Sequence, residues 1–150
     1  MESQTVEMPL RLLEIIEDFQ YSEGREKIEL LLEYSEKLAP LPEYLQKHHD
    51  SMDFVEECMT QVYVIAEDAE GGLRFYFDVP VESPTVRGFA AILSEGLKGA
   101  TVQQVLALST ELYTQMGLEQ VLSMQRLNGF SAILAHLKRI AAQRLDKPNV

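Results

Sequence analysis

One short tract of strand-forming residues stands between segments of helical periodicity, and it limits what this chain can fold into. Residues 61–66 and 73–79 are rich in Val, Ile, Tyr and Phe, and the turn-forming run 68–72 separates them. This pattern predicts a β-hairpin that ends at Pro80, because proline cannot donate to a sheet. The sequence leaves room for a third short strand near Phe54. A sheet this small needs helices to cover it.

Before the hairpin, apolar residues recur with the spacing of amphipathic helices. Helices are predicted over residues 8–20 and 25–38, and the second must stop before Pro40 because proline disfavours helix at the residue that precedes it. Residues 39–61 are predicted to be mostly loop with one helical turn. Within them, His48-His49-Asp50 is interpreted as a solvated stretch.

After the hairpin, capping residues mark the starts of further helices. Ser83, which is followed by proline, is predicted to cap one helix, and Thr101 with Gln104 forms a capping box for a short second one. Another helical piece is predicted from Ser109 to Met116, and Ser123 is predicted to cap the last helix. The order of elements predicts an α+β fold in which helices cover a small antiparallel β-sheet.

Length and charge narrow the class of protein. A chain of 150 residues with 46% hydrophobic and 25% charged residues is predicted to form a single domain, residues 1–150. No apolar run approaches the roughly 20 residues of a membrane span, and charges interrupt the first hydrophobic segment, so we expect a cytoplasmic protein. The net charge of −11 would repel nucleic acid and anionic lipid, and a protein is therefore the expected partner.

Cys58 is the one cysteine, so an internal disulfide is excluded. A lone cysteine is more often a buried small hydrophobe than a nucleophile. Cys58, however, follows the polar run 50–53 and precedes a strand, which predicts a loop at the sheet edge where a partner can reach it. Three histidines and one cysteine lack the paired spacing of a structural zinc site, and His136 is interpreted as structural.

Four stretches carry motifs that have the order and spacing of one family. Residues 38–42 form a leucine-proline stretch, and 58–63 (CMTQVY) is similar to the pattern Cys-Gln-Ser-Gln-Val-Trp. Residues 82–89 (ESPTVRGF) and 122–130 (LSMQRLNGF) resemble two helix starts, one with valine-arginine-glycine and one with arginine and asparagine-glycine. Together they resemble the SufE family of sulfur-acceptor proteins, over about residues 8–142.

The resemblance implies a function. It implies helices around a small antiparallel sheet, as in the IscU-type scaffold proteins, and it aligns Cys58 with the sulfur-accepting cysteine. Such a protein takes persulfide sulfur from a cysteine desulfurase, stimulates that enzyme and passes the sulfur to an iron–sulfur cluster scaffold. It is a sulfur-transfer protein with a covalent cysteine persulfide, and an activator rather than a free-standing enzyme. It needs no cofactor of its own, whereas the desulfurase uses pyridoxal phosphate.

The resemblance also suggests supporting residues. Arg87 and Arg126 match arginines of the family motifs, with Glu82 and Asn128 beside them, and these four are candidates for orienting the loop or docking the partner. Because each arginine lies near a helix start, a structural role stays open, including a tie between Arg126 and Glu82 or another acid. Glu57 replaces a glycine that many members carry before the cysteine, which leaves the flexibility of the loop open.

Two other functional classes compete with this interpretation. One is an acidic protein-binding module without covalent chemistry, in which Cys58 is a core residue; a Cys58→Ser variant separates the two. The other is a cysteine hydrolase or peroxidatic enzyme, which needs a base or a resolving group beside the thiol, and the sequence offers no convincing candidate. Which desulfurase and scaffold are served, and whether the chain forms a homodimer, stay open.

Overall fold

The computed structural model describes residues 6–56, 60–69 and 71–146. Its strands are β1 (Asp53–Phe54), β2 (Tyr63–Ala69) and β3 (Gly72–Asp78). Its α-helices are α1 (Leu10–Tyr21), α2 (Arg25–Lys37), α3 (Glu43–Lys47), α4 (Pro84–Gly96), α5 (Val102–Leu106) and α6 (Met124–Asp146). Three 3-10 turns complete the described elements: η1 (His49–Ser51), η2 (Leu112–Thr114) and η3 (Leu118–Gln120).

The sheet is antiparallel with the strand order β1-β2-β3. β2 and β3 form the predicted hairpin over seven residue pairs, and Gly71 in its turn has φ +76°, a conformation that favours glycine. β1 pairs with the other side of β2 through only two residue pairs, Asp53 with Val64 and Phe54 with Tyr63. The α+β class, the hairpin and the short third strand are therefore confirmed.

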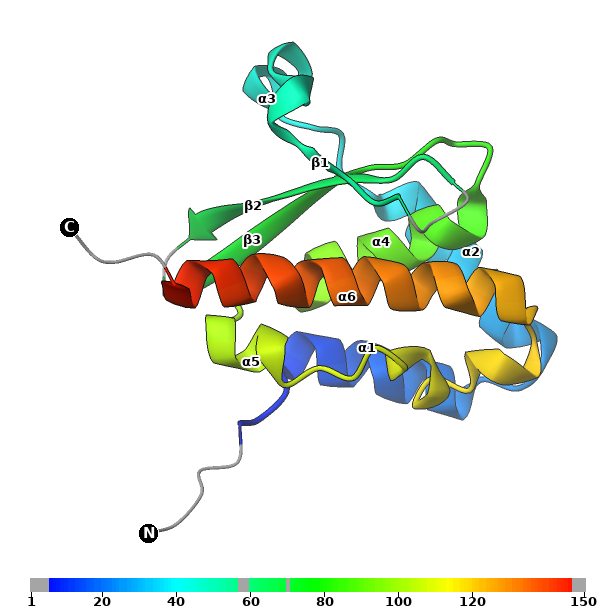
Figure 1. Cartoon of the computed structure of the whole chain (residues 1–150). Coiled ribbons are helices and arrows are strands. Elements are labelled where there is room, and N and C mark those ends of the chain that lie inside the picture. Colours follow the sequence, from blue (N-terminus) through cyan, green and yellow to red (C-terminus); the bar gives the residue numbers. More distant parts are fainter. Residues whose placement is uncertain (1–5, 57–59, 70, 147–150) are drawn as a thin grey trace, which may run out of the picture.

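Helices cover one face of this sheet (Figure 1). Along β2 and β3 the residues that face the helices are buried, in the alternation expected of a half-covered strand: Val64, Ala66, Leu73, Phe75 and Phe77. α4 contacts β3, α1, α2 and α6, so it lies at the centre of the packing. The rings of Phe89 in α4 and Phe130 in α6 stack with centroids 4.2 Å apart. In Figure 1, α3 projects away from these helices.

The close approach of α4 to α2 depends on a glycine. A Cβ atom at Gly88 would lie 2.2 Å from the carbonyl oxygen of Leu31, which is closer than real Cβ contacts. Gly88 therefore sets the depth at which α4 packs, and with it the position of the N-terminus of α4.

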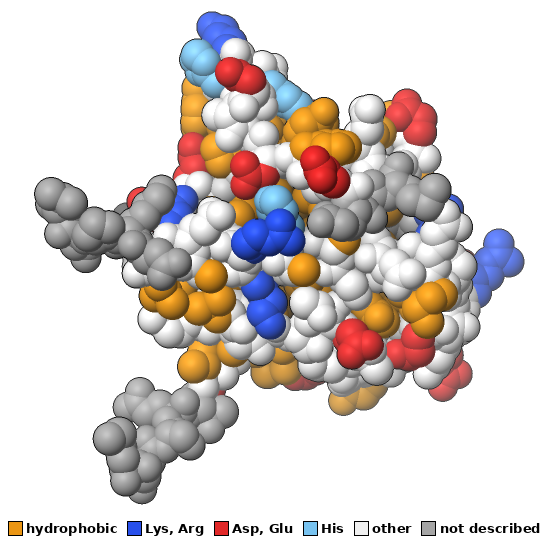
Figure 2. Space-filling view, in the orientation of Figure 1, with side chains coloured by type: hydrophobic (Ala, Val, Ile, Leu, Met, Phe, Trp, Pro, Cys, Tyr) orange, Lys and Arg blue, Asp and Glu red, His pale blue; other side chains and the backbone are white. Residues whose placement is uncertain are grey.

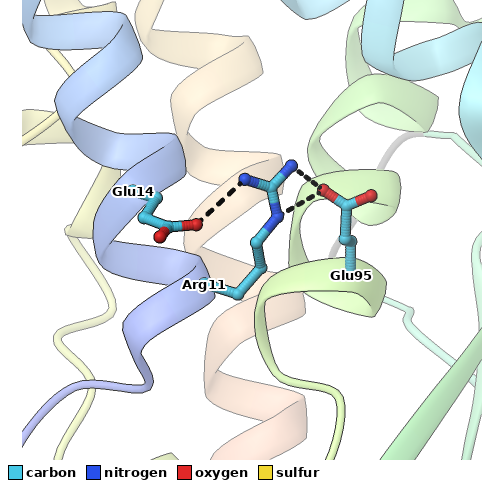
Figure 3. A network of polar contacts seen from close by, with 3 residues as sticks. All are labelled: Arg11, Glu14 and Glu95. Carbon is cyan, nitrogen blue, oxygen red and sulfur yellow. Dashed lines mark hydrogen bonds and ion pairs between the residues drawn. The ribbon is translucent and has the colours of Figure 1, made fainter.

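An ion pair on the surface ties α1 to α4 (Figure 3). Arg11 Nε donates to Glu95 Oε2 at 3.0 Å, and Arg11 Nη1 donates to Glu14 at 3.3 Å. These carboxylates, chiefly Glu95, raise the pKa of Arg11 above its ordinary value. Because the groups are exposed, the contribution to stability is expected to be below about 1 kcal/mol.

The last turn of α6 reaches the edge of the sheet. Arg144 Nη2 donates to the carbonyl oxygen of Ala66 at 2.8 Å, and Arg144 Nη1 pairs with the Asp68 carboxylate at 2.5 Å.

None of the helices in the described part of the chain is long and apolar enough to cross a membrane.

Three local predictions need correction in part. The helical piece predicted over 109–116 is reduced to the short 3-10 turn η2, and it is followed by Gly117, which has φ +72°. Ser83 occupies the N-cap position of α4 with Pro84 as the first helical residue, as predicted, but its side chain makes no capping bond. His49 is not simply solvated, since its Nε2 lies 2.8 Å from Asp78 Oδ2 and its ring packs against the ring of Tyr63.

Candidate active site

Cys58 lies outside the described residues, together with Glu57 and Met59. The chain on both of its sides is described. The Val55 amide donates to the Val62 carbonyl at 2.9 Å, which extends the pairing of β1 with β2 by one hydrogen bond. Position 58 therefore falls in the connection between two paired strands, and the predicted edge loop at Cys58 stays a prediction.

Thr60, two residues after the cysteine, forms part of the wall of a pocket of about 380 Å³. Its hydroxyl donates to Ser83 Oγ at 3.2 Å, which links the end of the Cys58 connection to the start of α4. The rest of the wall comes from the segment that leads into α4 and from the first turns of α6: Glu82, Ser83, Val86, Ser123, Gln125, Arg126 and Gly129. The pocket thus joins three parts of the chain that are distant in sequence.

Two helices begin at this pocket. Ser83 directly precedes α4, and Ser123 directly precedes α6, where its hydroxyl accepts a bond from the Arg126 amide at 3.4 Å. The N-terminus of a helix carries a partial positive charge because its first amides lack intrahelical partners. The pocket therefore offers a favourable setting for an anion such as a thiolate.

Arg126 adds a full positive charge to the pocket. Its Nη1 donates to the hydroxyl of Thr85, the second residue of α4, so the guanidinium bridges the starts of α4 and α6. Glu82 lies on the same wall, but Arg126 forms no ion pair with it or with any other acid in the described residues. The alternative in which Arg126 is tied to an acid is therefore not realised.

The other two candidate residues lie apart from the pocket. Arg87 Nε donates to the Ser35 carbonyl at 3.1 Å and its Nη1 donates to the Val79 carbonyl at 2.7 Å. These bonds join α4 to the last turn of α2 and to the residue that follows β3. Asn128 is exposed on α6 and is not part of the pocket wall.

Sequence reasoning did not assign Thr60, Ser83, Ser123 and Gln125 to the site. The two serines were visible as helix caps, and a cap marks a helix N-terminus that can bind an anion. Nothing local in the sequence indicated that the two helix starts meet. Among the described residues, no group of three or more His, Cys, Asp and Glu side chains could hold a metal ion.

Known proteins match this chain along most of its length. The family described as "SufE: Fe-S metabolism associated domain" matches residues 13–141. The chain belongs to the SufE family. A SufE-like protein of Mycobacterium tuberculosis, described as uncharacterized, is 37% identical over 133 residues, covering 88% of this chain and 92% of that protein.

Two further comparisons bear on function and fold. The "Cysteine desulfuration protein SufE" of Plasmodium vivax is 29% identical over 104 residues, covering 68% of this chain and 40% of that protein. A solution structure of a hypothetical protein from Thermus thermophilus has a TM-score of 0.80 and 33% identity, covering 94% of this chain and all of that one. The SufE assignment connects the chain to sulfur transfer in iron–sulfur metabolism.

Proposed function

We propose that this chain accepts persulfide sulfur on Cys58 from a cysteine desulfurase, stimulates that enzyme and passes the sulfur to an iron–sulfur cluster scaffold. The observation that supports this most directly is the pocket at Thr60, where two helix N-termini and Arg126 converge. Two residues of extended chain span at most about 7 Å, so Cys58 is tethered within short reach of that pocket.

The proposed reaction is a thiol exchange. The Cys58 thiolate attacks the terminal sulfur of a persulfide on the desulfurase, a new sulfur–sulfur bond forms, and the enzyme's cysteine leaves as a thiolate. Oxidation states balance, because one persulfide is exchanged for another. A scaffold thiolate then attacks the terminal sulfur of the Cys58 persulfide and regenerates the Cys58 thiolate. No cofactor on this chain takes part, and the pyridoxal phosphate belongs to the desulfurase.

The pocket suggests how the anionic forms of Cys58 are stabilised. A thiolate is the reacting form, and positive charge or a helix N-terminus lowers the pKa of a cysteine. Arg126 and the starts of α4 and α6 supply such charge, whereas Glu82 on the same wall opposes it. We assign Arg126 to the support of the Cys58 anion, and we assign Arg87 to the packing of α4 because its bonds go to backbone carbonyls.

Neighbouring acids work in the opposite direction. Asp53, Glu56 and Glu57 lie within the five positions before Cys58 in the sequence, and negative charge disfavours a thiolate. Asp53 is paired with His136, so its effect is partly offset when the imidazole carries a proton. We expect the Cys58 thiol to react slowly in the free protein and to become more reactive when the desulfurase docks. A reducing compartment such as the cytoplasm would keep that thiol available.

Intact-mass measurement tests the proposal. The protein is incubated with a cysteine desulfurase, cysteine and pyridoxal phosphate, and its mass is compared with and without a reductant. The expected result is the addition of one sulfur, which the reductant removes. Cys58→Ser, which is nearly isosteric, should accept no sulfur while keeping its melting temperature. Unfolding of that variant would instead favour the binding module in which Cys58 is a core residue.

A further inference from the structure

A second cleft lies between β1 and α6, outside the pocket at Thr60. Its volume is about 380 Å³. Phe54 of β1 and Ile140 of α6 provide apolar walls, while Arg139 and Gln143, one helical turn apart, provide polar ones. β1 leads directly into the connection that carries Cys58, so whatever occupies this cleft contacts the strand that precedes that connection.

Arg139 stands out among the basic residues of α6. The helix carries four basic side chains and one acidic side chain. Three of the basic ones are engaged: Arg126 by Thr85, Lys138 by the carbonyl of Leu108, and Arg144 by Asp68. Arg139 is exposed and has no hydrogen bond or ion pair with any residue that the structure describes. Its guanidinium is therefore available to an external group.

His136 and Asp53 are bonded to each other and form a polar part of the cleft wall separate from Arg139 and Gln143. His136 Nε2 lies 3.2 Å from Asp53 Oδ2, so the one carboxylate on the cleft wall is already engaged. His136 Nδ1 is buried and has no partner in the described part of the chain. An incoming anion would be repelled at the Asp53 end of the cleft and attracted at the end formed by Arg139 and Gln143.

We propose that this cleft is a docking site for a carboxylate side chain of the cysteine desulfurase, held by Arg139 with Gln143 as a second donor. A planar guanidinium binds a carboxylate through two parallel hydrogen bonds, and the apolar walls suit the methylene groups of Glu or a neighbouring apolar side chain. This inference rests on the proposed function, in which the partner is a cysteine desulfurase; the family is associated with Fe-S metabolism, and one relative is named for cysteine desulfuration.

The charge distribution of the chain supports an acidic partner segment at this place. The protein has a net charge of −11, and 20 of its 24 acidic residues precede residue 83. An acidic segment is repelled by most of that surface and can approach α6. Figure 2 shows basic and histidine side chains grouped near the middle of the face that α6 occupies in Figure 1.

A pair of charge reversals tests the docking site. Arg139→Glu removes the guanidinium, and Arg25→Glu makes the same change in net charge at an exposed arginine in the first turn of α2, which also has no partner in the described residues. The dissociation constant for the desulfurase is measured without cysteine, so that sulfur transfer makes no contribution. We expect Arg139→Glu to raise the Kd about tenfold and to weaken its salt dependence, and Arg25→Glu to change it less than twofold.

The outcomes separate this inference from the proposed function. Equal effects of the two reversals, or no binding by the unsubstituted chain, would overturn the docking site. Binding that depends on Arg139, together with no sulfur on Cys58 in the mass measurement, would support the site and refute the sulfur-acceptor role. The melting temperatures of both variants should match that of the unsubstituted protein. Arg139→Lys should restore only part of the affinity, because an ammonium cannot form the two parallel hydrogen bonds that a guanidinium makes with a carboxylate.

Discussion

His136 and Asp53 are 83 positions apart in sequence, yet Nε2 of the imidazole lies 3.2 Å from Oδ2 of the carboxylate. The pair joins the middle of α6 to β1. Because β1 contributes only two residue pairs to the sheet, this side-chain bond adds to the burial of Met52 and Val55 in holding the strand before Cys58 in place.

We expect His136→Ala to weaken the pairing of β1 with β2 on either side of the Cys58 connection. Loss of one hydrogen bond costs about 1 kcal/mol, so amide hydrogen exchange at Val55, which bonds the Val62 carbonyl, should accelerate about fivefold. The amide of Leu73, bonded to Ala100, serves as the internal control and should change little. His136→Gln retains a donor and should restore protection at Val55. Equal acceleration at both amides would indicate global rather than local destabilisation.

Arg126→Ala should lower the rate of sulfur transfer to Cys58 by about tenfold while changing the free energy of unfolding by less than about 1 kcal/mol. The reason is that Arg126 is exposed and its guanidinium bonds only the Thr85 hydroxyl in the described structure, so little of the fold depends on this side chain. Transfer is followed by intact mass over time, and unfolding by urea denaturation. A loss of stability with unchanged transfer per folded molecule would make Arg126 structural.

Arg87→Ala is expected to act on stability. Its guanidinium satisfies the carbonyl groups of Ser35 and Val79, and removing a charged donor from partly buried acceptors costs about 1–3 kcal/mol. Urea denaturation of Arg87→Ala beside Arg126→Ala measures the difference. If Arg87→Ala proved as stable as the unsubstituted protein, the assignment of Arg87 to packing would be wrong.

Gly88→Ala should be among the most damaging single-methyl additions in α4. The added Cβ would lie 2.2 Å from the Leu31 carbonyl oxygen, and the backbone of α2 cannot yield as a side-chain tip can. Overpacking of this kind costs about 1–3 kcal/mol, which thermal denaturation would detect. A neutral effect would mean that α4 can shift away from α2 without loss.

Tyr44 provides a prediction about pH. Its hydroxyl donates to the Glu67 carboxylate, and this bond, chiefly, raises the pKa of Tyr44 from 10.0 to about 12. A raised pKa in the folded state means that the stabilisation is fully present below pH 10 and is lost as pH rises towards 12. The tyrosinate absorbance difference between the unsubstituted protein and Tyr44→Phe should therefore titrate near pH 12, and in Glu67→Gln it should move back towards 10.

Local patterns predicted the secondary structure well where each signal lies within one element. The hairpin follows from strand-forming residues around a turn, and Thr101 with Gln104 forms both bonds of the predicted capping box. Lys27 shows the limit of such reasoning. It lies on a charged stretch of α2, yet it is buried, and its ammonium donates to the carbonyls of Phe19 and Ser22 at the end of α1. Both bonds depend on tertiary packing.

The candidate site, like the secondary structure, was predicted only in part from the sequence. Motif order indicated Cys58 and Arg126, since a family pattern records residue types at fixed spacing. It could not indicate that the starts of α4 and α6 converge on Thr60, because this depends on how the helices pack, with Phe89 stacked on Phe130. It also did not separate Arg126 from Arg87, whose partners are backbone carbonyls known only from the fold.

The bond from Arg144 to Ala66 has a consequence for self-association. β1 pairs with β2 only as far as Val64, and the carbonyls of Val62, Val64 and Ala66 point to the same side because strand carbonyls alternate. The rest of that side of β2 would be an open template on which another chain could add a strand and start aggregation. Arg144 occupies the Ala66 carbonyl and pairs with Asp68 beside it. Addition of a strand there would first have to displace the end of α6, so the helix hinders the pairing of β2 with a second chain.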